Sequence, residues 1–480
     1  MKIQLLILLV CIICVPKSAA KGDNQGQHQN TQIIQDYEQQ LTKLLKSLNE
    51  VSGVPGFSVA VMHKGELIAS VATGFSDLSK KITAEPDTTF RLASVSKVIG
   101  ATMLAELVVN GQLDPDLSIG HYYPELNPKY HSITLRQLLS HTSGMPHYQS
   151  IDHDIYDHFY TSAIEAATTL KDRDLLSTPG HQYLYSTHGY TLAGALYEKI
   201  TKQPLPKSVE DFIRRWTGRE TPAIENIHNL NKSSTKLYEL NQHGAKEIAY
   251  EEKSYSIFGT GFYASSSDLA SFGAQVLKRV KADKKYHRLL FTPTETQDGN
   301  IVTDRRFQVG FGWRISEDSY GRTVYHHAGA TPGARSILAI YPEHDLSIAF
   351  LSNSSWISSI DNLVFALASL YLDEAKAMEI DRTKYHISYQ GQQLKGTTAC
   401  QENQCFLTDN TTNYAHWLNT FNADSQPVNQ WPTFLYSVGQ DQRLLMVNKV
   451  GITAFDGKGN VFELKTGKFQ SYSIQLLNTE

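Results

Sequence analysis

Ser94 and Lys97 are spaced so that their side chains could share one chemical task. They open a helix predicted over Val95–Asn110, which follows an extended, strand-like approach at Thr89–Ala93. Because residues three apart on a helix lie on one face, the amine of Lys97 would lie beside the hydroxyl of Ser94. A hydroxyl and an amine held together can supply a nucleophile and its base without a His–Asp pair. The spacing therefore predicts covalent catalysis by a serine hydrolase.

A second Ser-x-x-Lys occurs at Ser233–Lys236 and limits what the spacing alone can establish. This copy lies in the polar stretch Asn226–Lys236 with no predicted strand before it, which is typical of a surface loop. The same structural alternative, a helix-capping serine with an exposed lysine, also applies to Ser94 taken by itself. The choice between the two copies depends on the rest of the chain.

The first residues have the features of a secretory signal peptide. Lys2 precedes the apolar run Ile3–Val15, and small residues at Ser18–Ala20 offer a cleavage site. The run is shorter than the ~20 residues that a membrane span needs. We therefore expect residues 1–20 to be removed, residues 21–32 to form a disordered lead, and the protein to be secreted or periplasmic with no membrane span.

Net charge limits the kinds of partner that we expect, and the cysteine content indicates a disulfide. The 480 residues carry a formal charge of −4, and removal of residues 1–20 would bring it to −6. So mild a negative charge argues against nucleic acid as a partner. Of the four cysteines, Cys400 and Cys405 would remain after export, and an oxidising compartment favours a disulfide between them.

No metal or other cofactor is expected. A C-x4-C pair without a nearby histidine is a poor zinc site. The adjacent pair His326 and His327 would point to opposite faces of a strand, so the two rings could not share one ion. The stretch Asp152–His158 mixes Asp and His, but we interpret it as a solvated loop and helix start rather than a metal site.

Hydrophobic periodicity predicts the elements that must position Ser94. Apolar residues repeat at helical spacing over 33–48, and two strands, Phe57–Met62 and Leu67–Thr73, form a hairpin. Helical patterns dominate Ile133–Ile200, beginning with a capping box at Thr134–Gln137. Strand patterns and a last helix follow from Gln308, at Phe311–Ile315, Thr323–His326, Ser336–Tyr341, Leu346–Leu351 and, for the helix, Asp361–Ala375.

These elements predict an α+β fold in residues 33–380: an antiparallel sheet, closed by segments from both ends of the domain and flanked by helices, with an inserted helical subdomain. Short strand candidates with turn signals then occur at Leu444–Val447, Gly451–Phe455, Val461–Leu464 and Ser471–Gln475. Residues 385–480 are therefore predicted to form a small, separate β-rich domain.

Five short segments, in this order and in this setting, resemble the serine β-lactamase-like, penicillin-recognising hydrolases. The segments are Phe90–Lys97, Leu138–Pro146, Tyr185–Thr187, Gly259–Ser265 and His327–Gly329. The chain is most similar to the subgroup of class C β-lactamases, D-Ala-D-Ala carboxypeptidases, related esterases and LACTB-like animal proteins, over roughly residues 40–378. The resemblance implies a β-lactamase/transpeptidase-like fold.

The resemblance also implies roles. Ser94 would be the nucleophile, with either Lys97 or Tyr185 as its base, and the backbone N–H groups of Ser94 and Ala330 would form the oxyanion hole. Thr187 stands where relatives usually carry Asn, so a shorter hydroxyl would have to help hold the substrate and the lysine. His327 and Gly329 would belong to the third motif, which contacts the substrate.

The third motif requires a choice, because a literal Lys465-Thr466-Gly467 also occurs. We place the motif at His327, at a strand end, because the two strands and the closing helix of the fold follow it. A histidine with a pKa of ~6.5 is mostly neutral near pH 7, unlike the lysine of relatives. The sequence thus favours a peptide or ester substrate over efficient β-lactam hydrolysis. A homo-oligomer is compatible with this interpretation, and the alternative is a non-catalytic sensor or a filament-forming scaffold.

Overall fold

The computed structural model describes residues 53–372, except 242–243, 305, 319–320 and 356–359. It also describes helical residues between 38 and 49 and the backbone of strands between 384 and 477. The predicted signal peptide (1–20), the lead (21–32) and the Lys-Thr-Gly at 465–467 lie outside the described residues.

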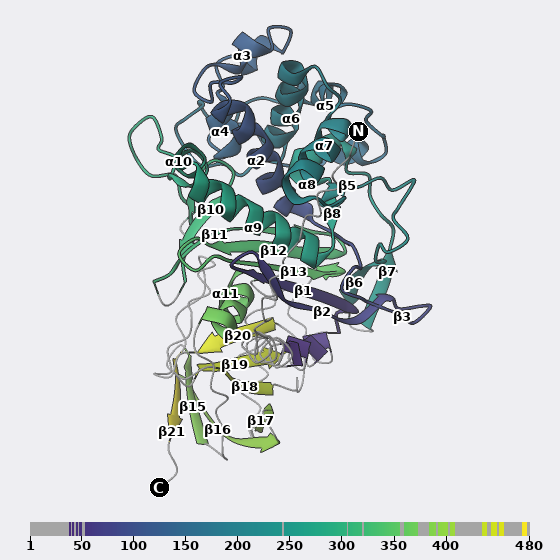
Figure 1. The fold of residues 1–480 in the computed structure, drawn as a ribbon, viewed down its shortest axis with the longest axis vertical. Coiled ribbons are helices and arrows are strands. Elements are labelled where there is room, and N and C mark those ends of the chain that lie inside the picture. Colours follow the sequence, from purple (N-terminus) through teal and green to yellow (C-terminus); the bar gives the residue numbers. More distant parts are fainter. Residues whose placement is uncertain are drawn as a thin grey trace, which may run out of the picture.

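An eight-stranded sheet lies at the centre of residues 53–372 (Figure 1), in the order β3-β2-β1-β13-β12-β11-β10-β9. The predicted hairpin forms β1 (Gly56–His63) and β2 (Glu66–Asp77), and β13 (Leu346–Ser352) pairs antiparallel with β1. The two ends of the domain therefore build one sheet, as predicted. The other strands are β3 (Ile82–Thr83), β9 (Gln308–Val309), β10 (Arg314–Glu317), β11 (Thr323–Thr331) and β12 (Ala334–Tyr341).

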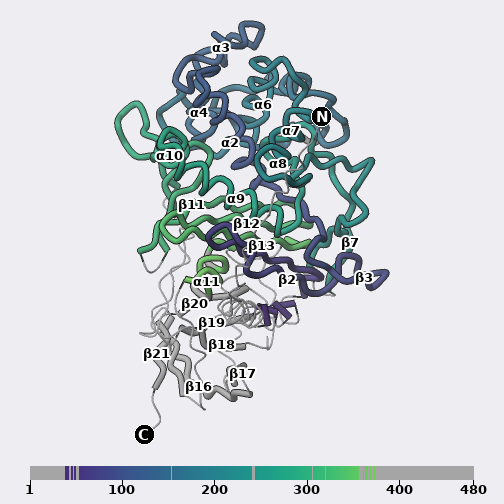
Figure 2. Tube along the Cα trace, viewed as in Figure 1, coloured from purple at the N-terminus to yellow at the C-terminus, as the bar shows by residue number. Residues whose placement is uncertain are grey.

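Helices cover both faces of the sheet, because each central strand is apolar on both sides. On β12, Leu338 and Ile340 enter one core while Ile337 and Ala339 enter the other. The first core lies under α9 (Ser266–Ala282), with α2 (Ser96–Val109), α6 (His188–Thr201) and α7 (Leu205–Thr217) beyond it. The second core lies against α11 (Ile360–Leu372) and the helical residues between 38 and 49, and Figure 2 traces this layered path.

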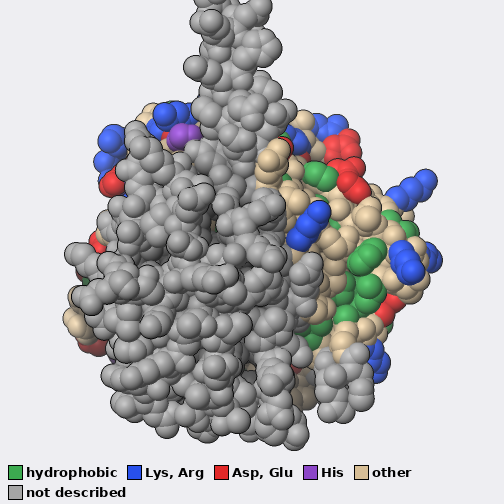
Figure 3. All heavy atoms as spheres, turned by 90° about the horizontal axis from the view of Figure 1, so that it is seen from below, with side chains coloured by type: hydrophobic (Ala, Val, Ile, Leu, Met, Phe, Trp, Pro, Cys, Tyr) green, Lys and Arg blue, Asp and Glu red, His purple; other side chains and the backbone are tan. Residues whose placement is uncertain are grey.

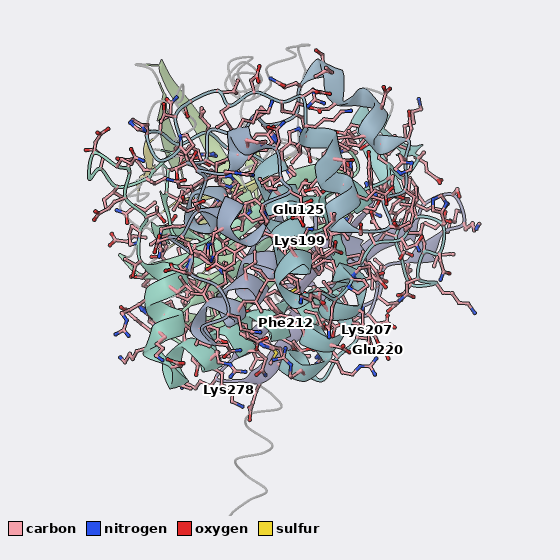
Figure 4. The ribbon with its side chains drawn as sticks, turned by 90° about the horizontal axis from the view of Figure 1, so that it is seen from above. Glu125, Lys199, Lys207, Phe212, Glu220 and Lys278 are labelled. Atoms are coloured by element: carbon pink, nitrogen blue, oxygen red, sulfur yellow. The ribbon has the colours of Figure 1, made fainter. Side chains whose placement is uncertain are left out.

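The helical insertion lies on the α2 side of the sheet and begins as predicted. The side chain of Thr134 accepts from the N–H of Gln137, and the Gln137 side chain accepts from the N–H of Thr134, so the capping box is present. Figure 4 looks onto this side, where Lys199 of α6 reaches Glu125 with 3.3 Å between Nζ and Oε2. The other α-helices described in residues 53–372 are α3 (Ile119–Tyr122), α4 (Leu135–Leu139), α5 (Ala163–Ala167), α8 (Ile257–Thr260) and α10 (Lys284–Phe291).

Two small sheets complete the domain. One joins β4 (Phe90–Arg91), the strand just before Ser94, to β8 (Phe262–Ala264) and β5 (Ala223–Ile224). The other joins β14 (Ser354–Ser355), β6 (Leu237–Asn241) and β7 (Gly244–Ile248). The predicted strand at Phe90 is thus confirmed, and it ends two residues before the turn that carries Ser94.

Two strand predictions near the site were wrong in their bounds. The strand predicted to begin at Phe311 begins at Arg314, because Gly312 has φ 81° and interrupts the extended backbone. The strand predicted to end at His326 continues to Thr331, because it pairs with β12 over its whole second half. His327 is therefore in the middle of β11 and not at a strand end.

The C-terminal strands form one seven-stranded antiparallel sheet in the order β20-β19-β18-β17-β16-β15-β21. Their bounds are Lys384–Tyr389 (β15), Gln392–Gln401 (β16), Gln404–Thr408 (β17), Phe434–Val438 (β18), Arg443–Asn448 (β19), Gly451–Phe455 (β20) and Ser473–Leu477 (β21). Cys400 and Cys405 are opposite each other across β16 and β17. The disulfide itself stays a prediction, as does the separate domain, and Val461–Leu464 lies outside the described residues.

Surface composition agrees with the modest net charge. Figure 3 shows acidic, basic and apolar side chains interspersed on the described surface in view. Among the described helices, none combines the length and the apolar character needed to cross a bilayer.

Candidate active site

The backbone before α2 presents Ser94 on a strained turn. Ala93 has φ 47°, a left-handed conformation that residues with a Cβ rarely adopt. Leu92 holds this turn from both sides, since its N–H donates to Phe262 O at 2.8 Å and its carbonyl accepts from Ser336 Oγ at 2.5 Å. Strain of this kind persists where surrounding contacts over-determine the backbone. The turn leaves the side chain of Ser94 partly exposed at the head of the helix.

Gly329 allows β11 to approach the Ser94 turn closely. A Cβ at this position would lie 2.3 Å from Leu92 O and 3.0 Å from Ser94 N, so only glycine fits. Ala330 follows on the same strand with an exposed side chain. The close approach brings this part of β11 beside Ser94 N, which supports the predicted pairing of the Ser94 and Ala330 N–H groups as an oxyanion hole; that pairing stays a prediction.

Lys97 is fully buried, at 0% exposure, and its amine donates to three oxygens. The distances from Nζ are 3.2 Å to Ser94 Oγ, 3.1 Å to Thr187 Oγ1 and 2.9 Å to Gly259 O. Burial lowers the pKa of Lys97, and the interaction with Tyr185 opposes this only in part. All three acceptors are uncharged oxygens, so the site favours the neutral amine more than water does.

Tyr185 completes a three-residue constellation around the Ser94 hydroxyl. Its phenol donates to Ser94 Oγ at 2.9 Å, so Ser94 Oγ contacts both predicted bases. Burial acts to raise the pKa of Tyr185, but the charges of Lys97 and Arg314 outweigh it, and the pKa of the phenol is lowered. Both candidate bases are thus shifted toward titration nearer neutral pH, which is typical of groups that move protons in catalysis.

The structure brings the other predicted site residues to the same place. The hydroxyl of Thr187 reaches the Lys97 amine in spite of its short side chain. The His327 ring is buried and 6.5 Å from the Tyr185 ring, measured between centroids, and its Nδ1 lies 2.7 Å from Ala328 O. Burial, together with the charges of Arg314 and Lys97, holds the pKa of His327 well below its usual range. His327 is therefore neutral here, in agreement with the expectation that it supplies no permanent charge.

Three further residues at this site were given no role from the sequence. The His141 ring lies 4.3 Å from the Tyr185 ring, and the His147 ring lies 5.2 Å from it. The guanidinium of Arg314 lies over Phe307, 4.3 Å from the ring centre, and within the described residues no carboxylate is paired with it. His141 could have been noticed inside the segment Leu138–Pro146, whereas His147 and Arg314 are in no recognisable motif.

The structure separates the remaining candidates from the site. The second Ser-x-x-Lys is on the loop, as predicted, and the Lys236 amine pairs with Glu247 at 3.1 Å. The interpretation of Asp152 as a solvated residue was wrong: it is 2% exposed, ion-paired with Arg173 and 3.1 Å from Nε2 of His188. Its carboxylate is satisfied inside the protein by Arg173, by His188 and by the N–H of Gln149. In the described ranges no His, Cys, Asp and Glu side chains cluster as three or more potential metal ligands.

Comparison with known proteins agrees with this geometry. The family model described as Beta-lactamase matches residues 41–356. The serine beta-lactamase-like protein LACTB of Homo sapiens, described as mitochondrial, is 24% identical over 394 residues, which cover 62% of this chain and 71% of that protein. Protein flp of Staphylococcus aureus (strain N315) is 22% identical over 330 residues, 67% of this chain and 64% of its own length.

Solved structures show the same fold. An octameric penicillin-binding protein homologue from Pyrococcus abyssi superposes with a TM-score of 0.59 at 17% identity, covering 86% of this chain and 98% of that one. The D-amino acid amidase from Ochrobactrum anthropi SV3 gives a TM-score of 0.56 at 21% identity, with 68% and 92% covered. The family match spans well over half of the sequence and contains Ser94, Lys97 and Tyr185. This chain belongs to the β-lactamase family of serine hydrolases.

Proposed function

We propose that this protein is an exported hydrolase that cleaves an amide or ester through an acyl-enzyme on Ser94. The observation that carries the proposal is the Ser94 hydroxyl, which lies 3.2 Å from Lys97 Nζ and 2.9 Å from Tyr185 Oη. A base takes the Ser94 proton while Oγ attacks the substrate carbonyl carbon. The proton then passes to the leaving amine or alcohol as its bond to carbon breaks, which leaves an acyl-serine. Water repeats these steps and releases the acid.

Lys97 and Tyr185 share one titratable proton in this scheme. A neutral lysine with a phenol, and an ammonium with a phenolate, carry the same total charge and differ only in the proton's position. Because both pKa values are lowered and both groups contact Ser94 Oγ, either form can accept the serine proton. A pH profile would therefore report an apparent pKa of the pair and not of one residue.

Arg314 and His327 suggest the substrate class. Relatives with lysine in the third motif have a permanent charge there, whereas His327 is neutral. Arg314 is a permanent cation whose charge reaches His327, and no carboxylate of the described residues pairs with its guanidinium. We propose that Arg314 receives a carboxylate of the substrate, which favours peptide-like amides or acidic esters over β-lactams as good substrates.

Export and assembly are parts of the same proposal. The predicted signal peptide at residues 1–20 has no Arg, unlike the Arg-rich presequences that direct import into mitochondria, where the human relative is placed. N-terminal sequencing of the protein recovered outside the cell should begin near residue 21. Because one structurally similar protein is octameric, we also propose a homo-oligomer. Light scattering of the recovered protein would measure its oligomeric state.

A substrate panel tests the proposed activity. It should contain p-nitrophenyl esters, D- and L-amino acid amides, a D-Ala-D-Ala peptide and nitrocefin. We expect wild type to cleave an ester or amide, Ser94→Ala to lose that turnover, and Ser233→Ala, the matched change in the second Ser-x-x-Lys, to behave like wild type. Arg314→Gln should raise KM for a carboxylate-bearing substrate and leave KM for a neutral ester unchanged. Nitrocefin turnover at the level of a true β-lactamase would refute the substrate class. An inert wild type that nevertheless binds penicillin would favour the non-catalytic sensor or scaffold.

A further inference from the structure

His141 occupies a left-handed backbone position that residues other than glycine seldom adopt. Helix α4 ends at Leu139, and His141 has φ 62° two residues later, where helices commonly place Gly or Asn. The residue is nevertheless buried, at 3% exposure. A histidine kept in a left-handed conformation inside the protein points to a task for its side chain or its carbonyl.

The contacts of His141 bracket Tyr185 from both sides along the chain. The N–H of Leu184 donates to His141 O at 2.7 Å, and the N–H of Ser186 donates to His141 Nδ1 at 3.1 Å. The two rings also lie against each other, with centroids 4.3 Å apart and planes inclined by 36°. Tyr185 is therefore fixed by its preceding residue, by its following residue and by one face of its ring.

These contacts define the protonation state that the arrangement needs. Nδ1 accepts a hydrogen bond, so it carries no proton, and the proton of the neutral ring is on Nε2. Burial and the charge of Lys97 hold the pKa of His141 well below its usual range, so the ring stays neutral at ordinary pH. A protonated ring would lose the Ser186 contact and would add a second positive charge near Lys97.

His147 makes the corresponding contact one residue further along. Its Nδ1 accepts from the N–H of Thr187 at 3.3 Å, and its ring meets Tyr185 edge-on, with centroids 5.2 Å apart and planes at 85°. Burial first, and then the charge of Lys97, lower the pKa of His147 to about 4. Two neutral imidazoles thus hold consecutive residues, of which the second, Thr187, also binds the Lys97 amine.

We propose that His141 is a positioning residue that sets the Tyr185 phenol against Ser94 by accepting from the Ser186 N–H at Nδ1. The inference rests on the proposed acyl-enzyme mechanism, because it assigns Tyr185 a proton-transfer role. His141 itself contacts neither Ser94 nor Lys97 in the hydrogen bonds described, so it acts only through Tyr185 and its neighbours.

A pair of substitutions separates this role from a role in packing alone. His141→Asn keeps an acceptor oxygen where Nδ1 lies and tolerates the left-handed backbone. His141→Gln moves the acceptor one bond further out. We expect His141→Asn to stay within about threefold of wild type, and His141→Gln to lose about 10²-fold in kcat with little change in KM, the size of effect that a ~1 Å misplacement produces. A displaced Tyr185 phenol would be affected less by the charges of Lys97 and Arg314, which lower its pKa. The acid limb of the His141→Gln pH profile should therefore move to higher pH. His121→Asn, at an exposed histidine, is the matched control.

A second readout does not need turnover. Hydrogen exchange of the Ser186 amide, followed by mass spectrometry, should be protected in wild type and His141→Asn and faster in His141→Gln. A folded His141→Gln variant with wild-type kcat and pH profile would overturn the proposal, as would a His141→Asn variant as slow as His141→Gln. If wild type turns over nothing but Ser186 loses protection in His141→Gln, the contact stands and the proposed function fails.

Discussion

Replacing Lys97 by Met should separate activity from stability. Methionine keeps the length of an unbranched side chain but removes the amine that contacts Ser94, Thr187 and Gly259. It also removes the charge that lowers the pKa of Tyr185. The variant therefore loses one candidate base directly and weakens the other, while the apolar volume of the site is nearly kept.

The size of the activity loss follows from the loss of the Lys97 base and the weakening of the Tyr185 base. A positioned general base contributes about 10²–10⁴ in rate. With both routes impaired, we expect kcat/KM of Lys97→Met to fall by about 10³–10⁴, which corresponds to roughly 4–5 kcal/mol in the activation barrier. The size of the loss should be similar for ester and amide substrates, because both need the same proton transfer from Ser94.

The stability of Lys97→Met should rise or stay nearly the same, although its activity falls. The lowered pKa of Lys97 means that this site disfavours the charged amine relative to water. Its removal relieves a desolvation cost of several kcal/mol. Removal of the amine also leaves Gly259 O and Thr187 Oγ1 without this donor. An unsatisfied buried polar group lowers the free energy of unfolding by about 1–3 kcal/mol. We expect a Tm equal to or above that of wild type.

Thermal unfolding and steady-state kinetics on the same preparations measure both effects. Lys97→Arg serves as a control that keeps the charge but not the compact amine. A Lys97→Met variant with more than about a tenth of wild-type kcat/KM would refute the reasoning on the base, since a general base is worth at least about 10². A variant that fails to fold would show that the buried charge is structural.

Three further changes have distinct expected outcomes. Tyr185→Phe should lower kcat/KM by about 10²–10⁴ and shift the acid limb of the pH profile, because the phenol contact to Ser94 is lost and Lys97 alone remains to titrate; an unchanged pH profile would contradict its role. Because the pKa of His147 is about 4 in the fold against 6.5 when unfolded, the unfolded state binds more protons between these values. The free energy of unfolding should therefore fall as pH is lowered through this window, by up to ~1.4 kcal/mol per pH unit for one such group, and denaturant titrations should show a shallower fall in His147→Asn. Arg91→Met should destabilise the fold by about 3–5 kcal/mol because it leaves buried Glu225 unpaired; Glu225→Gln added to it should restore part of the Tm, and no recovery would contradict the pairing.

The sequence could predict the frame of the site because local signals agree there. Strand β4 before Ser94, the helix after it and the capping box at Thr134 all follow from short-range patterns. The extension of β11 through His327 could not be seen in the same way, because it depends on pairing with β12 and not on the residues of β11 alone. The sequence therefore predicted which elements exist near the site more accurately than it predicted where they begin and end.

The supporting residues of the site could not be predicted, because their roles arise from contacts between distant segments. Arg314 is on β10, and its charge lowers the pKa of Tyr185, more than one hundred residues earlier in the chain. Asp152 looked like a solvated acid because nothing nearby in sequence announces its partners Arg173 and His188. His141 was inside a recognised segment, but its link to Ser186 depends on the folded backbone.

The central claim, that Ser94 forms the acyl-enzyme, is tested most directly by trapping the intermediate. Wild type mixed with a p-nitrophenyl ester and quenched with acid during the first turnover should carry one acyl group per chain, and peptide mapping should find it on the peptide that contains Ser94. Ser233→Ala should give the same adduct and Ser94→Ala none. An adduct that persists in Ser94→Ala, or one mapped to another residue of wild type, would contradict the account.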